Sequence, residues 1–253
     1  MLIDFHTHLD FYKSEELEEQ LAEFSGTIVA AAVDEKSYLA NVAISNHTKT
    51  TARACRIIPT FGIHPNRADE NAPLLDDSAT TQRFEKYLAQ SPIIGEIGMD
   101  FCWSKCSHQN QEKVFRWFME YCNKRGKACV IHTKDAEQEI CNILTDYPHA
   151  RPIIHWYDGP ENIYCEFIRR NYMQTFGVET IRSPHLQKLL HLTPSELLLL
   201  ETDNPDSEPW LGGTRSDVGL IERVYDEIAG LLGMSRPALE KLIEGNCNRI
   251  LSN

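Results

Sequence analysis

The sequence predicts an α/β fold, a single-domain TIM (β/α)8 barrel that covers residues 1–253. Two observations lead to this fold class. Eight strand-like apolar runs alternate with amphipathic helical segments, and the length of 253 residues matches the roughly 250 typical of one barrel. Such alternation indicates βα units around a parallel sheet, and eight units favour a closed barrel over an open doubly wound sheet. With 42% hydrophobic and 25% charged residues, the chain has the composition of a globular protein.

The candidate strands are short apolar runs, and several of them are continuous, as expected of parallel strands that are covered on both faces. In chain order they are Ile3–His8, Ile28–Val33, Ile57–Ile63, Ile93–Gly98, Cys129–His132, Pro152–Trp156, Gln174–Val178 and Leu197–Thr202.

Helical segments lie between and after these runs. The first begins with a cap residue, and the second is followed by Gly126, a typical helix stop. The four clearest segments are Ser14–Phe24, Gln109–Arg125, Asp217–Leu232 and Arg236–Leu251. The stretch Asn204–Gly213 is rich in proline, glycine and aspartate and is interpreted as a loop after the last strand, not as a domain boundary.

The formal net charge is −12, which argues against the broad basic surface of a protein that coats nucleic acid. An acidic body with a locally cationic site would instead favour short or single-stranded substrates. No apolar run approaches the roughly 20 residues that span a bilayer, and the N-terminus lacks the pattern of a signal peptide. We therefore expect a cytoplasmic protein without membrane contact, whose eight cysteines are free thiols.

Cys102, Cys106 and His108 form a local group that offers three zinc-ligating side-chain types. The group lacks the usual half-site with two residues between its cysteines. We therefore favour half-buried thiols in a loop over a structural zinc site.

Ionisable side chains recur at the ends of the predicted strands. Any one of them alone is as readily explained as a hydrogen-bonded core residue. A barrel brings its strand ends together, however, and six such residues at corresponding ends favour metal ligation. Four imidazoles and two carboxylates suit a binuclear site for zinc, manganese or magnesium. The six residues are His6, His8, Glu96, His132, His155 and Asp203.

The charge of such a site favours an anionic substrate. Two divalent cations and two carboxylates leave about +2, which attracts phosphate. In this interpretation Glu96 bridges the two ions, and Asp203 accepts the proton of the attacking water. These two carboxylates are therefore the candidate catalytic residues.

The motifs around these residues resemble those of the TatD family of metal-dependent hydrolases and deoxyribonucleases. The similarity extends over residues 1 to 205 and returns near the C-terminus, with the motifs in the order of the family. The matching segments are Asp4–Asp10, Gly62–Pro65, Gly95–Phe101, Gln109–Phe118, Val130–Ala136, His155–Gly159, Glu201–Pro205 and Asn246–Leu251.

The resemblance implies a TIM barrel of the metallo-dependent hydrolase type with a pair of divalent ions. By matched position, one ion takes His6, His8, Glu96 and Asp203, and the other takes Glu96, His132 and His155. The implied activity is that of a deoxyribonuclease, often a 3′→5′ exonuclease on single-stranded DNA. His64 matches a family histidine near the substrate phosphate, and we favour that role over one as a turn residue before Pro65.

The chain departs from the family in loops that would line the mouth of the barrel. Thr214–Asp217 stands where many members have Arg-Asn-Xaa-Pro, and His155–Gly159 reads His-Trp-Tyr-Asp-Gly instead of a sequence such as His-Cys-Phe-Thr-Gly. A divergent member of this kind resembles the QatD-like group of anti-phage gene clusters. That resemblance implies protein partners in an antiviral defence complex.

Several residues of these loops are candidates for substrate contact. The aromatic side chains offer surfaces for base stacking, although packing over the barrel core explains them equally well. The basic side chains offer contacts to phosphate, although solvated surface charge is the default interpretation of any one of them. The aromatic residues are Trp103, Trp156 and Trp210, and the basic residues are Lys134, Arg182 and Arg215.

Two other functions compete with the nuclease. One is ester or amide hydrolysis on a small molecule or an aminoacyl-tRNA, because the same metal-activated water attacks either electrophile. The other is a non-catalytic barrel that binds partners in a complex. Six converging ligands argue against a pure scaffold.

Overall fold

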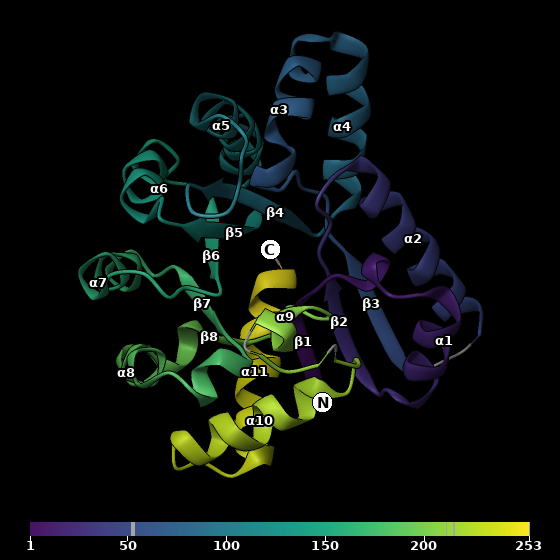
Figure 1. The fold of residues 1–253 in the computed structure, drawn as a ribbon, viewed down its shortest axis with the longest axis vertical. Coiled ribbons are helices and arrows are strands. Elements are labelled where there is room, and N and C mark those ends of the chain that lie inside the picture. The colour runs from purple at the N-terminus through teal and green to yellow at the C-terminus, as the bar shows by residue number, and fades with distance from the viewer. Residues whose placement is uncertain (52–53, 211, 215, 253) are drawn as a thin grey trace. The chain divides into compact units, whose positions relative to one another are not determined.

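The computed structural model describes residues 1–51, 54–210, 212–214 and 216–252 (Figure 1). They pack into two compact units. The terminal unit comprises Met1–Ala31, Leu39–Pro59 and Gln174–Ser252, and the central unit comprises Ala32–Tyr38 and Thr60–Met173. That the whole chain forms one domain stays a prediction.

Parallel strands build the terminal unit. Strands β1, β2 and β3 pair in that order, and β7 pairs with β8. Beyond β8 the chain runs beside the end of β1, because the Asp203 amide donates to the His6 carbonyl and the His8 amide donates to the Asn204 carbonyl. The strands are β1 (Leu2–Thr7), β2 (Gly26–Ala30), β3 (Cys55–Pro59), β7 (Met173–Phe176) and β8 (Leu198–Leu200).

Helices in the terminal unit pack on these strands. The buried Tyr225 hydroxyl of α10 contacts both the amide and the carbonyl of Ile3 at 3.2 Å, which fixes α10 against β1. The Asn246 amide of α11 donates to the carbonyl of Leu198 at the start of β8. The α-helices assigned here are α1 (Ser14–Glu23), α2 (Glu35–Thr50), α8 (Pro184–Leu192), α9 (Ser207–Trp210), α10 (Leu220–Leu231) and α11 (Arg236–Leu251), of which α2 begins in the central unit.

The central unit is built around β4 (Ile93–Asp100), β5 (Ala128–Lys134) and β6 (Arg151–His155), which pair in parallel. All residues of β4 and β5 are buried. The register places Gly98 beside His132 and His132 beside His155. Neighbouring strands therefore carry these two histidines at the same level of the sheet.

Helix α5 packs on β4, and helix α6 packs on β5 (Figure 1). Helix α5 starts where the Ser107 hydroxyl caps the Asn110 amide, and it ends at Gly126, which adopts the left-handed conformation with φ 61°. The α-helices of this unit are α3 (Ala68–Asn71), α4 (Ser78–Gln90), α5 (His108–Arg125), α6 (Glu137–Ile143) and α7 (Glu161–Arg169).

Each predicted strand overlaps an observed one, and the predicted ends differ most from the observed ends in two of them. The predicted Ile28–Val33 is observed as Gly26–Ala30, and Ile57–Ile63 is observed as Cys55–Pro59. The apolar residues that follow β2 are buried but do not form strand. The Val33 amide among them donates a hydrogen bond to the Ser37 hydroxyl. An apolar run does not distinguish buried strand from buried turn.

The predicted loop Asn204–Gly213 contains a short helix, α9. Helix α10 begins at Leu220, three residues later than the predicted Asp217, and the Asp217 carbonyl accepts hydrogen bonds from the Asn204 side chain and the Leu220 amide. In the described ranges, no helix combines the length and the apolar character that crossing a membrane requires.

A buried carboxylate ties β1 to the segment after β8. Asp4 accepts hydrogen bonds from the Thr202 hydroxyl at 2.6 Å and from the Thr202 amide at 3.1 Å. Its side chain is almost wholly buried, and burial raises the pKa of the Asp4 carboxyl to about 7, against the opposing effect of these hydrogen bonds.

We expect Asp4→Asn to change how stability depends on pH. The raised pKa means that the folded metal-free protein binds a proton between about pH 4 and pH 7 that the unfolded chain does not. This contribution to stability is complete below about pH 4 and is lost as the pH rises to about 7. The difference in Tm between variant and wild type should therefore shift in favour of the variant across this range. The exposed Asp226→Asn is the matched control, and parallel Tm profiles for Asp4→Asn and wild type would contradict the expectation.

Candidate metal centre

Two imidazoles and a carboxylate meet at the ends of β1 and β8 in the terminal unit. The Nε2 atoms of His6 and His8 lie 3.3 Å apart. The Oδ1 atom of Asp203 lies 3.4 Å from His6 Nε2 and 3.2 Å from His8 Nε2. The three donor atoms form a group that could hold a metal ion.

Local backbone geometry brings this terminal cluster together. His6 belongs to β1, whereas His8 follows the strand, so the predicted end of the strand at His8 is one residue too long. Asp203 adopts the left-handed region with φ 54°, which is uncommon for a residue other than glycine. The surrounding structure holds it there through the bond of its amide to the His6 carbonyl.

The chemistry of this donor set fits a cation. Two ring nitrogens and a carboxylate oxygen within 3.4 Å of one another present electron pairs toward a common point. His6 and His8 are buried, so water screens their repulsion poorly. A proton or a metal ion among these atoms removes the repulsion, and imidazole with carboxylate is a donor set typical of zinc and manganese.

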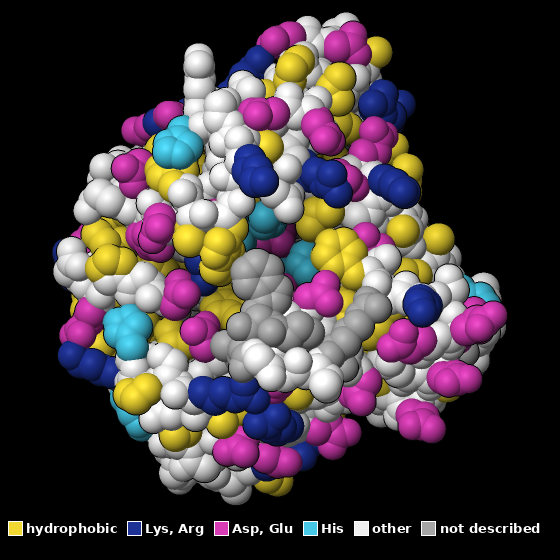
Figure 2. Space-filling model, viewed as in Figure 1, with side chains coloured by type: hydrophobic (Ala, Val, Ile, Leu, Met, Phe, Trp, Pro, Cys, Tyr) yellow, Lys and Arg dark blue, Asp and Glu magenta, His cyan; other side chains and the backbone are white. Residues whose placement is uncertain are grey.

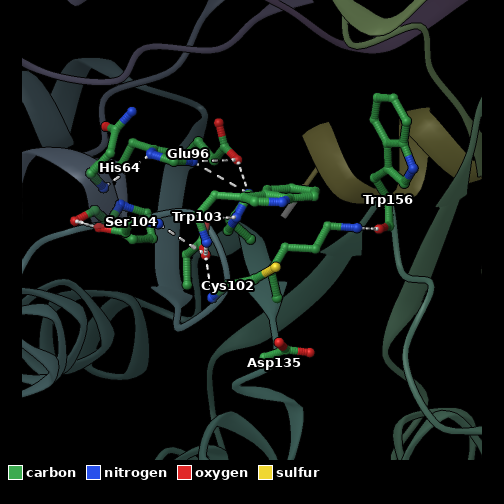
Figure 3. A network of polar contacts seen from close by, with 12 residues as sticks. His64, Glu96, Cys102, Trp103, Ser104, Asp135 and Trp156 are labelled. Carbon is green, nitrogen blue, oxygen red and sulfur yellow. Dashed lines mark hydrogen bonds and ion pairs between the residues drawn. The ribbon is translucent and has the colours of Figure 1, made fainter. Parts of the chain in front are cut away.

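A second cluster is built around β4 and β5 in the central unit, with Glu96 and His132 inside these strands. Glu96 Oε1 lies 2.9 Å from His132 Nδ1 and 3.6 Å from His64 Nε2. His155 Nε2, on β6, lies 3.7 Å from the same Glu96 oxygen. The donor atoms of His64, Glu96 and His132 form a further group that could hold a metal ion. Figure 3 shows His64 and Glu96 turned toward each other.

The close approach of two strands positions His132. Gly98 of β4 has φ 149° and lies against His132, so that a Cβ atom at this position would clash with the His132 carbonyl oxygen. Glycine is therefore required for this spacing. The motif that contains Glu96 and Gly98 thus supplies both a candidate ligand and the space that the neighbouring strand needs at His132.

Asp100 is a further functional candidate. It lies in the family motif Gly95–Phe101, but the sequence alone assigned it no role. Its Oδ2 atom lies 3.2 Å from His132 Nε2, and its Oδ1 atom accepts from the amides of the following loop. Burial raises the pKa of Asp100, but hydrogen bonds from His132 and from the loop prevail and lower it to about 2. Its place four residues after Glu96, on the same face of a strand, was the available signal.

Hydrogen bonds distinguish the two histidines of the central cluster. The Asn66 amide donates to His64 Nδ1, so a neutral His64 carries its proton on Nε2, the nitrogen that faces the cluster. His132 is the converse case, because a proton on Nε2 is shared with Asp100 and leaves Nδ1 to face Glu96. His132 is thus suited to ligate through Nδ1, whereas His64 is suited to donate a hydrogen bond.

The central cluster favours a proton on His132 at the place where a metal cation could bind. Burial lowers the pKa of His132, but its hydrogen bonds to Asp100 and Glu96 and their charges raise it to about 9. A site that favours positive charge on an imidazole among two carboxylates favours a bound cation for the same electrostatic reason.

The structure places Lys134 and Arg182, two of the basic residues predicted to contact substrate. The Lys134 ammonium is buried and donates to Asp158 Oδ1 at 2.7 Å and to the Trp156 carbonyl at 2.9 Å. Arg182 donates to Glu208 at 2.9 Å in the terminal unit. Arg215 and the side chain of Trp210 lie outside the described residues.

The structure gives the zinc alternative no support. Cys102 and Cys106 are free thiols, and the His108 ring stacks on Phe101 with centroids 3.7 Å apart. Among the described residues, the groups that could hold a metal do not include these three side chains.

Parallel βα units that carry histidine and carboxylate clusters on or just after their strands are typical of metal-dependent hydrolases. The family model for TatD related DNase matches residues 3–252. The chain therefore belongs to the TatD related DNase family, as its motifs indicated.

Relatives and solved structures agree with this assignment. The uncharacterized metal-dependent hydrolase YabD of Bacillus subtilis is 26% identical over 265 residues, which cover 99% of this chain and 98% of YabD. The 3′-5′ ssDNA/RNA exonuclease TatD of Erwinia billingiae is 28% identical over 204 residues, which cover 76% of each chain.

The crystal structure of YJJV, a TatD homologue from Escherichia coli, superposes with a TM-score of 0.82 at 20% identity and covers 100% of this chain and 98% of that one. This likeness shows the fold, and it confirms the predicted α/β TIM barrel of the metallo-dependent hydrolase type.

Replacing Asp100 tests its hold on His132. We expect Asp100→Asn to weaken the binding of zinc or cobalt by about 10- to 100-fold, the range typical of partners that orient a metal-ligating histidine. Isothermal titration of the metal-free protein measures this affinity directly. Asp76→Asn, at an exposed carboxylate of the same unit, is the control. Equal affinity of Asp100→Asn and wild type would show that the contact does not orient a ligand.

Proposed function

We propose that this chain is a divalent-metal-dependent deoxyribonuclease that acts as a 3′→5′ exonuclease on single-stranded DNA. One observation carries the proposal: the donor atoms of His6, His8 and Asp203 converge within 3.4 Å, as a cation requires. Membership of the TatD related DNase family and the exonuclease name of the Erwinia relative support DNA as the substrate.

Two metal ions are proposed, of zinc, manganese or magnesium. His6, His8 and Asp203 would hold one, and Glu96, His132 and His155 would hold the other. When bound, such ions supply Lewis-acid activation of water and neutralise the charge that develops on phosphate. That Glu96 bridges both ions stays a prediction.

The side chains of the two clusters have separate roles in this proposal. Asp203 is 23% exposed, so its carboxylate can accept the proton of an attacking water. Glu96, which is only 2% exposed, keeps the imidazoles of His132 and His64 oriented through its Oε1 atom. His64 directs its Nε2–H toward the central cluster and can donate to a phosphate oxygen there.

The remaining contacts are less direct. The Lys134 ammonium donates a hydrogen bond to Asp158. Lys134 would therefore affect substrate binding indirectly, by positioning the segment that contains Asp158. Arg215 as a phosphate contact stays a prediction.

The charge distribution favours a single strand over a wrapped duplex. The sequence carries a net charge of −12, and on the face drawn in Figure 2 acidic side chains are interspersed with basic ones. Tight duplex binding relies on many contacts between basic side chains and phosphates, and such binding weakens steeply as salt rises. A nuclease that binds one strand at a small cationic site needs fewer contacts between basic side chains and phosphates.

Cytoplasmic location and partners in an antiviral defence complex stay predictions. Ester or amide hydrolysis, on a small molecule or an aminoacyl-tRNA, is the competing function at the same site. The assay below is arranged to separate these chemistries.

We expect the metal-loaded protein to shorten single-stranded DNA from its 3′ end, and His132→Ala to reduce this rate by roughly 100-fold or more. Loss of a ligand should cost at least as much as loss of a partner that only orients one. The measurement pairs metal analysis of each variant with a panel of 3′- and 5′-labelled DNA, RNA and an ester substrate. His149→Ala, at an exposed histidine of the same unit, is the control.

Three outcomes would count against the proposal. Turnover of the ester with DNA left intact would replace the nuclease with the competing hydrolase. Equal activity of His132→Ala and wild type would remove the metal site from the reaction. Partner-dependent function that survives Glu96→Ala and metal loss would favour a scaffold.

A further inference from the structure

We propose that Trp103 is a stacking platform for one unpaired nucleobase of the substrate strand. The inference rests on the proposed nuclease function and assigns a residue that would make the site prefer single strands. It is carried by three features of the central unit: a rigid loop, a half-exposed indole, and an ammonium that lies against two tryptophan rings.

The loop that carries Trp103 is held at several points. Asp100 Oδ1 accepts from the amides of Cys102 at 2.9 Å, Trp103 at 2.7 Å and Ser104 at 3.3 Å. The buried Gln111 side chain bonds to the amide and carbonyl of Asp100, and the Ser104 hydroxyl donates to the Pro65 carbonyl. A loop with its amides gathered on one carboxylate presents its side chains in a fixed direction.

The Trp103 side chain is kept near the surface despite this rigid support. It is 49% exposed, which is high for a large apolar residue. Figure 3 shows the loop of Cys102, Trp103 and Ser104 beside His64 and Glu96. An exposed indole on a fixed backbone binds an aromatic partner at little entropic cost, because few rotatable bonds are immobilised.

The same carboxylate connects this indole to the candidate metal ligand. Asp100 holds the Trp103 amide through one oxygen, and its other oxygen lies 3.2 Å from His132 Nε2. A base stacked on Trp103 would therefore sit at a fixed offset from the group at His132. Positioning of this kind determines which phosphodiester of a bound strand reaches the site.

Lys134 places a second aromatic ring nearby. Its buried ammonium lies 5.4 Å from the Trp103 ring centroid and 5.8 Å from that of Trp156. It also holds the Trp156 carbonyl and Asp158, in a turn where Trp156 adopts φ 38°. Lys134 is thus a positioning residue for the two indoles. Its charge also makes their environment favourable for an electron-rich π system.

The test follows a fluorescent base on a strand that resists cleavage. The probe is a short oligothymidylate with phosphorothioate linkages and 2-aminopurine at the 3′-terminal or the adjacent position. With the metal-loaded wild type we expect quenching at one of these positions. Trp103→Ala should abolish that quenching and weaken binding about tenfold, a typical loss for one base stack. Trp103→Phe should restore most of both.

Trp117→Phe is the matched control. Trp117, on α5, packs against Phe84 of α4 and Phe118 of α5, so its replacement should leave quenching unchanged. The same variants are assayed on strands whose 3′-terminal nucleotide has a base or is abasic. Wild type should favour the strand with the base through KM, and Trp103→Ala should lose that preference.

If wild type cleaves DNA but Trp103→Ala keeps the quenching and the preference, the stacking role is wrong and the nuclease stands. If wild type neither binds nor cleaves DNA, the proposed function fails and the stacking role fails with it.

Discussion

Each candidate metal cluster depends on one electrostatic constraint, which is that ligand atoms packed this closely, most of them buried, need a positive charge among them. His6, His8 and Asp203 meet this condition in the terminal unit, and His132 with Glu96 meets it in the central unit. The pKa of His132, raised to about 9, shows how strongly the second group attracts positive charge. Burying these groups together would cost stability in a protein that had no use for a bound cation.

Much of the fold follows from patterns that a single sequence contains. Helix α11 has the predicted bounds, and Gly126 ends α5 as its conformational freedom suggests. The end of β2 was not predictable, because the apolar residues that follow it are buried in a turn held by Ser37. Burial and strand structure usually occur together, and sequence alone cannot separate them where a side chain takes over a backbone hydrogen bond.

The polar residues of the site were predictable for a different reason. Charged and imidazole side chains are costly inside apolar strands, so Glu96 and His132 stand out without any structure. Asp100 did not stand out, because it ends its strand where a solvated carboxylate is common. Its importance comes from the register that sets it against His132, and from a loop whose amides converge on it. Such relations depend on distances between segments far apart in sequence.

Asp100 also limits which changes of sequence the loop that carries Trp103 can accept without an effect on His132. Its two carboxylate oxygens make different contacts. One lies against His132, and the other accepts hydrogen bonds from the loop that carries Trp103. A change in that loop that withdrew its amides would leave the carboxylate less well satisfied, and the electrostatics at His132 would shift with it. The backbone of the Trp103 loop and the geometry at the candidate ligand His132 are therefore physically linked here. A change in the backbone path of this loop would therefore disturb the contact between Asp100 and His132, whereas a change of the exposed Trp103 side chain would leave that contact in place.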